Sequence, residues 1–184
     1  MNEYEFELQF QLRPEEDPEQ YLDPLYEAGC DDSTIGIGKK GHIGLLFHRE
    51  ATSACNAIKE AVSNVFSAIP HAKLHQANPY LQNTNELAYE FGFTKQNMRL
   101  YTNNQAAAPQ EPFPTPIITG ARTSYWLTIE VAIWLQDQAG FEIPPEKIDT
   151  LSAIQALNLI INESKQRQPS WKKSFSEVLK YNAA

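Results

Sequence analysis

The N-terminal residues alternate strictly between apolar and polar side chains, and this pattern constrains the fold more than any other feature of the chain. Every second position is apolar, namely Tyr4, Phe6, Leu8, Phe10 and Leu12, and Glu or Gln occupies the positions between them. A period of two places all the apolar side chains on one face of a β-strand. The chain must therefore build a sheet with one covered face, and Arg13-Pro14 ends its first strand.

Periodicity and turn residues predict five further elements in the same unit. They are a helix, the two strands of a hairpin, a second helix and a closing strand, over residues 18–28, 34–37, 42–48, 54–69 and 71–77. Gly29 is placed to end the first helix, and Thr52 or Ser53 can cap the second. The order β-α-β-β-α-β predicts an α+β fold with a ferredoxin-like two-layer domain over residues 1–78.

A pair of short helices is predicted beyond Asn78-Pro79. Asn83 and Glu86 have the spacing of a capping box, which opens a helix that runs to residue 91. Thr94 can cap a second helix that runs to about residue 101. Gly92 tolerates the positive φ that the turn between them requires. The spacing of apolar residues in both helices is typical of a helix-turn-helix, although any αα-hairpin shares much of this pattern.

A hairpin and a third helix complete the second unit. The Pro-rich residues 106–116 predict an extended connection. Residues 117–119 and 124–126 then form two short apolar runs around Gly120, and residues 127–138 have helical periodicity. Helix, turn, helix, hairpin and helix together predict a winged helix-turn-helix domain over residues 79–140.

Two sets of residues resemble known proteins. Phe113-x-Pro-x-Pro, Gly120-x-Arg122, Trp126 and Glu130-Val131-x-x-Trp134-Leu135, placed after a helix pair, resemble the compact DNA-binding unit of MerR-type regulators and phage excisionases. The segments around Gly29-Cys30-Asp31-Asp32 and Phe47-His48-Arg49 resemble a family of small bacterial proteins described as DNA-binding. This resemblance implies sequence-specific binding to double-stranded DNA by a bacterial or phage transcriptional regulator.

The expected DNA-binding residues lie on the second helix of the pair and on the hairpin: Thr94, Lys95, Gln96, Asn97, Arg99, Thr119, Arg122 and Thr123. Gln96 and Asn97 can pair bidentately with adenine, and Arg99 can pair with guanine or a phosphate. Lys95, Arg122 and the threonine hydroxyls suit phosphates, and Arg122 could also enter the minor groove. The alternatives are that Gln96 and Asn97 are simply solvated and that Arg99 pairs with Glu86 or Glu90.

The charge distribution argues for a second copy of the chain. The chain carries 15 basic and 23 acidic residues, a net charge of −8, and residues 1–78 alone carry −7. Lys95, Arg99 and Arg122 are the only basic residues expected near the DNA. One protomer should therefore bind DNA weakly, and its affinity should depend little on salt. Apolar residues surround the predicted helix at 147–166, and Trp171, Phe175, Val178 and Leu179 form a further stripe. We therefore expect a homodimer through residues 141–184, unless these helices only complete the core.

The chain has no apolar run long enough for a membrane span, and its acidic start does not resemble a signal peptide. Cys30 and Cys55 are too few for a disulfide framework and suit free thiols. We therefore expect a cytoplasmic protein with no membrane partner.

No pattern predicts a catalytic site. Gly36-x-Gly38-x-x-Gly41 resembles a dinucleotide motif but lies in a predicted hairpin, and the four histidines have no zinc-site spacing. We expect no catalytic residue, metal or cofactor, and hence no enzyme. The rival hypothesis is a protein-interaction adaptor or antitoxin-like protein whose acidic N-terminal domain binds a partner protein.

Overall fold

The computed structural model describes residues 1–106, 109 and 111–165. It is a mixed α+β structure with two antiparallel sheets. The first unit contains β1 (Asn2–Gln11), the 3-10 helix η1 (Pro18–Tyr21), α1 (Leu22–Glu27), β2 (Ser33–Gly36), β3 (His42–Ala51), α2 (Ala54–Ala68) and β4 (Lys73–Asn78). All five elements predicted after the first strand are confirmed, and the first helix begins with a 3-10 turn that has Pro18 at its start.

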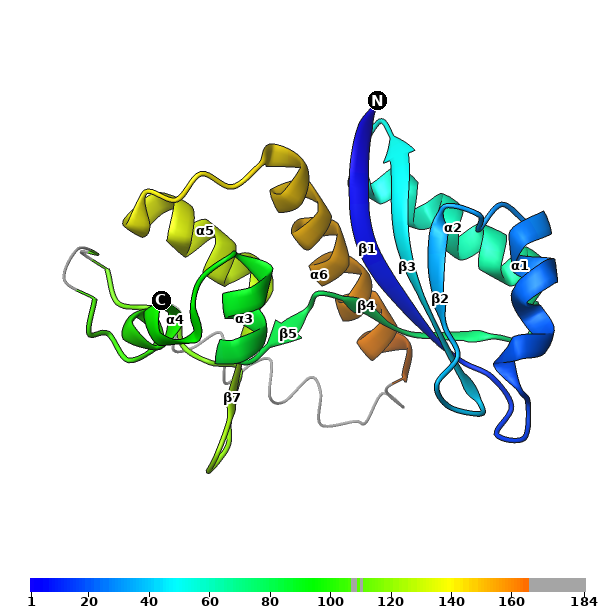
Figure 1. Cartoon of the computed structure of the whole chain (residues 1–184), viewed down its shortest axis with the longest axis horizontal. Coiled ribbons are helices and arrows are strands. Elements are labelled where there is room, and N and C mark those ends of the chain that lie inside the picture. The colour runs from blue at the N-terminus through cyan, green and yellow to red at the C-terminus, as the bar shows by residue number, and fades with distance from the viewer. Residues whose placement is uncertain (107–108, 110, 166–184) are drawn as a thin grey trace, which may run out of the picture.

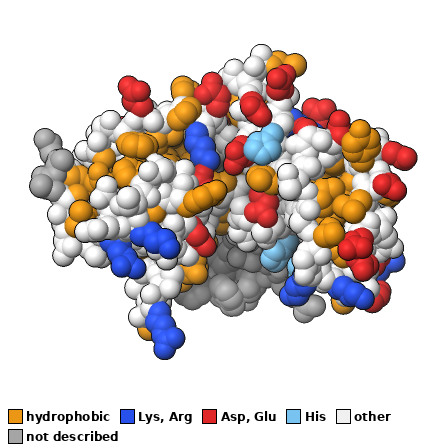
Figure 2. Space-filling view, viewed as in Figure 1, with side chains coloured by type: hydrophobic (Ala, Val, Ile, Leu, Met, Phe, Trp, Pro, Cys, Tyr) orange, Lys and Arg blue, Asp and Glu red, His pale blue; other side chains and the backbone are white. Residues whose placement is uncertain are grey.

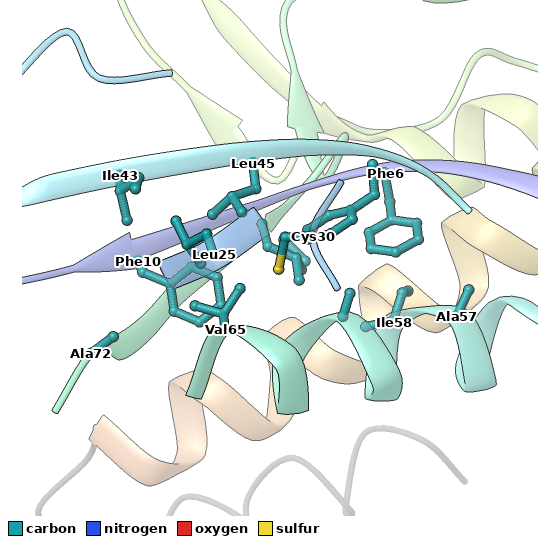
Figure 3. Packing of buried hydrophobic residues seen from close by; sticks show 14 of the residues in the cluster. Phe6, Phe10, Leu25, Cys30, Ile43, Leu45, Ala57, Ile58, Val65 and Ala72 are labelled. Atoms are coloured by element: carbon teal, nitrogen blue, oxygen red, sulfur yellow. The ribbon is translucent and has the colours of Figure 1, made fainter. Parts of the chain in front are cut away.

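The first sheet has the strand order β2-β3-β1-β4, and each neighbouring pair is antiparallel. The alternating residues of β1 are all buried, and Phe6 lies opposite Phe47 and Leu8 opposite Leu45 on β3. Figure 3 shows Phe6 and Phe10 packed toward Ile58 and Val65 of α2. The predicted one-sided sheet is therefore present, and none of the described helices packs over its polar face.

The second unit contains β5 (Leu81–Gln82), α3 (Thr84–Glu90), α4 (Lys95–Thr102), β6 (Ile118–Thr119), β7 (Ser124–Leu127) and α5 (Thr128–Ala139). Its strands form a small antiparallel sheet in the order β5-β7-β6. β5 was not predicted from the sequence, because two residues are too few to show a period. Its pairing with β7 anchors the hairpin to the chain that enters the helix pair.

The last described helix, α6 (Pro145–Lys165), lies between the two units (Figure 1). Ile154 belongs to the core beneath the first sheet, whereas Leu151 belongs to the core of the second unit. The buried amide of Asn158 donates to the carbonyl of Ala77 at 2.7 Å and accepts from its N–H at 3.0 Å. α6 thus covers the outer edge of β4 and is a shared part of both cores.

The position of α6 accounts for the apolar residues that surround it. Most of these apolar side chains are buried against other parts of the same chain. Leu159 and Ile160 are the large apolar side chains of α6 that stay exposed. The predicted homodimer surface is correspondingly reduced. The apolar stripe predicted for residues 171–179 lies outside the described residues. Within the described part of the chain, no helix is long and apolar enough to cross a membrane.

Candidate nucleic-acid interface

α3 and α4 are joined by a tight turn at Gly92. Asn83 Oδ1 accepts from the N–H groups of Asn85 and Glu86, and Glu86 Oε2 accepts from the N–H of Asn83 at 2.8 Å. The predicted capping box is therefore present. Gly92 has φ +70°, the left-handed conformation that glycine adopts without strain. The turn needs glycine for its backbone angles and not for lack of space, since a Cβ there would meet no atom within 4 Å.

α4 presents polar side chains to solvent along its first turns. Thr94 Oγ1 caps the helix by accepting from the N–H of Asn97 at 3.2 Å, and Met98 is fully buried beneath it. Lys95, Gln96 and Arg99 are exposed. Within the described residues, none of these three side chains has an ion pair or a hydrogen bond. They are available to a ligand.

Helix geometry separates the predicted contact residues of α4 into two groups. Each residue turns the helix by about 100°, so Lys95, Arg99 and Gln96 span a sector of about 100°. Asn97 lies about 160° around the helix from Arg99 by the same geometry. Asn97 and Arg99 therefore cannot face the same strip of a flat surface, and Gln96 is the amide that lies beside Arg99.

The β6–β7 hairpin projects away from the helices (Figure 1). Thr119, Arg122 and Thr123 are all exposed on it. At its tip the N–H of Gly120 donates to the carbonyl of Thr123 at 3.1 Å, and a Cβ on Gly120 would come within 2.7 Å of the same oxygen. The tight turn holds Arg122 at the end of the hairpin.

Arg99 and Arg122 line one surface hollow of about 390 Å³ between α4 and the hairpin. Trp126, Gly120 and Ala121 also line it. The remaining side chains along it are small and polar, and they come from the start of α3, the end of α4 and the hairpin: Asn83, Thr84, Asn85, Thr102, Asn103, Thr123 and Ser124. Figure 2 shows Lys and Arg side chains over α4 and at the end of the projecting hairpin. The contribution of α3 was not predicted from the sequence, because only the packing of the hairpin brings Thr84 and Asn85 to the hollow.

The carboxylates proposed as alternative partners of Arg99 are engaged elsewhere. Glu86 accepts from the N–H of Asn83, and Glu90 forms an ion pair with Lys147 of α6 and accepts from Gln82. Among the described residues Arg99 therefore has no carboxylate partner, and its side chain is available to an external anion.

Aromatic side chains hold the hairpin and the Pro-rich connection against the helices. Phe113 packs edge-on against Trp126 and Trp134, with ring centroids 5.9 and 4.9 Å apart. Trp126 Nε1 donates to the carbonyl of Pro114 at 2.9 Å, and Trp134 Nε1 donates to that of Glu111 at 3.2 Å. The motif Phe113-x-Pro-x-Pro thus positions the hairpin relative to α4 without contacting the hollow through its own aromatic ring.

The described residues contain no group of three or more His, Cys, Asp or Glu side chains that could hold a metal ion. Both cysteines are free, and burial raises the pKa of the Cys30 thiol to about 11. That value keeps Cys30 protonated at neutral pH, so it lacks the thiolate that nucleophilic or metal chemistry uses.

Comparison of the chain with protein-family models, with curated proteins and with solved structures found no match. What points to a function is therefore the geometry of the chain itself.

Proposed function

We propose that residues 79–140 form a winged helix-turn-helix unit that binds double-stranded DNA, and that the protein is a transcriptional regulator. The hollow shared by Arg99 and Arg122 carries this proposal. Two arginines from separate elements line it, and its lining residues include no carboxylate, which is an arrangement that suits phosphates or base edges. α4 would enter the major groove, and the β6–β7 hairpin would be the wing.

The two groups of α4 residues suggest a division of roles. Gln96 and Arg99, side by side, would contact base edges, since these side chains can pair bidentately with adenine and guanine. Lys95, Arg122 and the hydroxyls of Thr119 and Thr123 would contact phosphates. Thr94 acts first as the helix cap, and Asn97 would reach only bases or phosphates on the far side of α4.

The first unit supports a ferredoxin-like assignment. Its chain order is β-α-β-β-α-β, and its sheet order is β4-β1-β3-β2 with all neighbours antiparallel, which is the arrangement of a split βαβ pair. α1 and α2 pack on the same face of that sheet. We assign residues 1–78 to this fold, with α6 added beside α2.

Selection of sequences from a random duplex pool by the full-length protein tests the DNA-binding proposal. Selected and scrambled duplexes are then compared by fluorescence anisotropy. Gln96→Ala should cost roughly 1–3 kcal/mol on the selected duplex only, whereas Arg122→Gln should weaken both duplexes. Lys59→Gln, which removes an exposed charge on α2, is the matched control. Failure to enrich any sequence, together with no binding at low salt, would contradict the proposal.

A second candidate function is docking of a basic segment of a partner protein. A hollow of about 440 Å³ between the open face of the first sheet and α3 is lined by four carboxylates, from Glu5, Glu7, Glu86 and Glu90. Binding of a Lys-rich peptide, measured by calorimetry, tests it. Glu5→Lys should abolish peptide binding and leave DNA binding intact, and an unchanged peptide affinity in that variant would reject this candidate.

A further inference from the structure

One end of the first sheet carries basic side chains from three parts of the chain. Lys39 and Lys40 lie in the β2–β3 connection, and the β1 residue Gln11 lies opposite both His42 on β3 and Lys73 on β4. The same end receives the last residue of α6. We call this region the basic end, and it consists of Lys39, Lys40, His42, Lys73, His75 and Lys165.

Lys165 ties α6 to this end of the sheet. Its Nζ donates to the carbonyl of His75 at 2.8 Å and lies 3.3 Å from His75 Nδ1. Burial lowers the pKa of His75, and the charges of Lys165 and His42 lower it further. Within the described residues, none of the four lysines of the basic end forms an ion pair. An anion bound there would relieve the repulsion among these groups.

Three carboxylates of the loop after β1 lie near the basic end; those of Glu16 and Asp17 are engaged by other groups, and Glu15 is exposed. The loop after β1 reaches this end, where the N–H of Gly41 donates to the carbonyl of Glu16. The carboxylate of Glu16 is bound by Arg13 and His71, and Asp17 caps η1. Their negative charge is thus partly offset by hydrogen bonds and cations of their own, unlike the positive charge of the lysines.

The sheet surface beside the lysines is hollowed. Gly36 and Gly44 lie directly opposite each other on β2 and β3, so no side chain rises from either position. A hollow of about 330 Å³ results, and Lys39, His42 and His75 lie along it. Glu7 also lines it, and the two carboxylate oxygens of Glu7 accept from the side-chain amides of Gln9 and Asn78. The glycines leave space for a ligand, but they do not form a dinucleotide-binding loop, because the element that follows them is the strand β3 rather than a helix.

The basic end and the proposed DNA-binding surface lie on the same edge of the molecule. In Figure 1 the β2–β3 connection and the β6–β7 hairpin both point toward the lower margin. Figure 2, in the same view, shows Lys and Arg side chains of both units toward that margin, with Asp and Glu side chains beside those of the first unit and along the upper margin. A duplex lying along the lower margin would meet positive charge from both units.

We infer that the basic end binds phosphate groups, and that their source is the backbone of the DNA held by α4 and the hairpin. This inference rests on the proposed function and extends it, because the first unit would then add phosphate contacts within one protomer. Lys39 and Lys40 are the principal contacts, since they are exposed on the projecting connection. His42, His75 and Lys165 line or support the hollow behind them.

The test is the salt dependence of DNA affinity for the full-length protein on a random 30-base-pair duplex, a length of about three helical turns. Removal of one lysine that binds a phosphate should reduce the slope of log K against log salt by about 0.9. Lys39→Gln/Lys40→Gln should therefore lower the slope by about 1 to 2. The matched control Lys59→Gln on α2 should leave it unchanged, and Arg122→Gln should lower it by about 1.

Three outcomes separate the inference from the proposed function. Equal slopes for the double variant and Lys59→Gln, with a reduced slope for Arg122→Gln, would overturn the inference and leave the proposed function standing. Wild-type slopes for all variants, including Arg122→Gln and Arg99→Gln, would overturn both. In a parallel NMR titration, a shift of the His75 ring signals with inorganic phosphate, combined with an unchanged DNA slope, would identify free phosphate as the source and reject the DNA backbone.

Discussion

Substitution of Arg49 by Ala should lower the stability of the first unit more than any surface substitution does. Arg49 is 6% exposed and lies on β3, over the ring of Phe47. Its Nε and Nη2 donate to the two oxygens of Asp32 at 2.7 and 2.8 Å, and Nη2 also donates to the carbonyl of Gly29 at 2.7 Å. The ion pair thus holds the connection between α1 and β2 against the inner strand β3.

The magnitude follows from what each partner loses. Breaking a buried ion pair by removing one member costs about 3–5 kcal/mol, because the other charge is left uncompensated. The side chain of Asp32 is 30% exposed, so water can solvate it in part, and the carbonyl of Gly29 still accepts from Asn64 Nδ2. We therefore expect the lower end of that range, about 3 kcal/mol, for Arg49→Ala.

Urea unfolding followed by far-UV circular dichroism measures this loss. Arg49→Lys keeps the charge but lacks the planar fork, so it should lose about half as much. Asp32→Ala combined with Arg49→Ala should show a coupling energy of about 2 kcal/mol in a double-mutant cycle. A loss below about 1 kcal/mol for Arg49→Ala, or no coupling in the cycle, would refute the reasoning that the ion pair stabilises the fold.

Three further predictions concern the turn, α6 and assembly. Gly92→Ala should cost about 1–2 kcal/mol of stability for its positive φ, and Gly92→Val more, whereas Gly38→Ala should be nearly neutral, all measured by urea unfolding. Asn158→Leu should cost about 2–4 kcal/mol, because it leaves a buried N–H and a buried carbonyl of β4 unpaired; a loss under about 1 kcal/mol would show that α6 does not seal this edge. Light scattering should find a dimer for the full-length protein and a monomer for Leu159→Asp/Ile160→Asp, and a wild-type monomer would reject the homodimer.

Local sequence features predicted most of the elements correctly. A helix cap such as Asn83 with Glu86, the glycine at position 92 and the alternation of β1 act between residues a few positions apart, so they can be recognised without knowing the fold. The helix pair, the hairpin and the helix after it were therefore all anticipated, with bounds shifted by one or two residues.

Contacts between residues distant in the sequence were decided only by the tertiary structure. The segments that contain Gly29 and Arg49 are about 20 residues apart, and no local pattern shows that Arg49 binds Asp32 and the carbonyl of Gly29. The hollow between Arg99 and Arg122 likewise depends on how the Phe113 segment packs the hairpin against the helices.

The role of α6 illustrates the same limit most clearly. Its sequence shows that it must be buried on several sides, because apolar residues surround it. Burial against a second copy and burial inside the chain satisfy that requirement equally well, since the hydrophobic effect has no direction. Only the position of Asn158 beside the backbone of Ala77, with Leu151 and Ile154 in different cores, assigns α6 to the space between the two units.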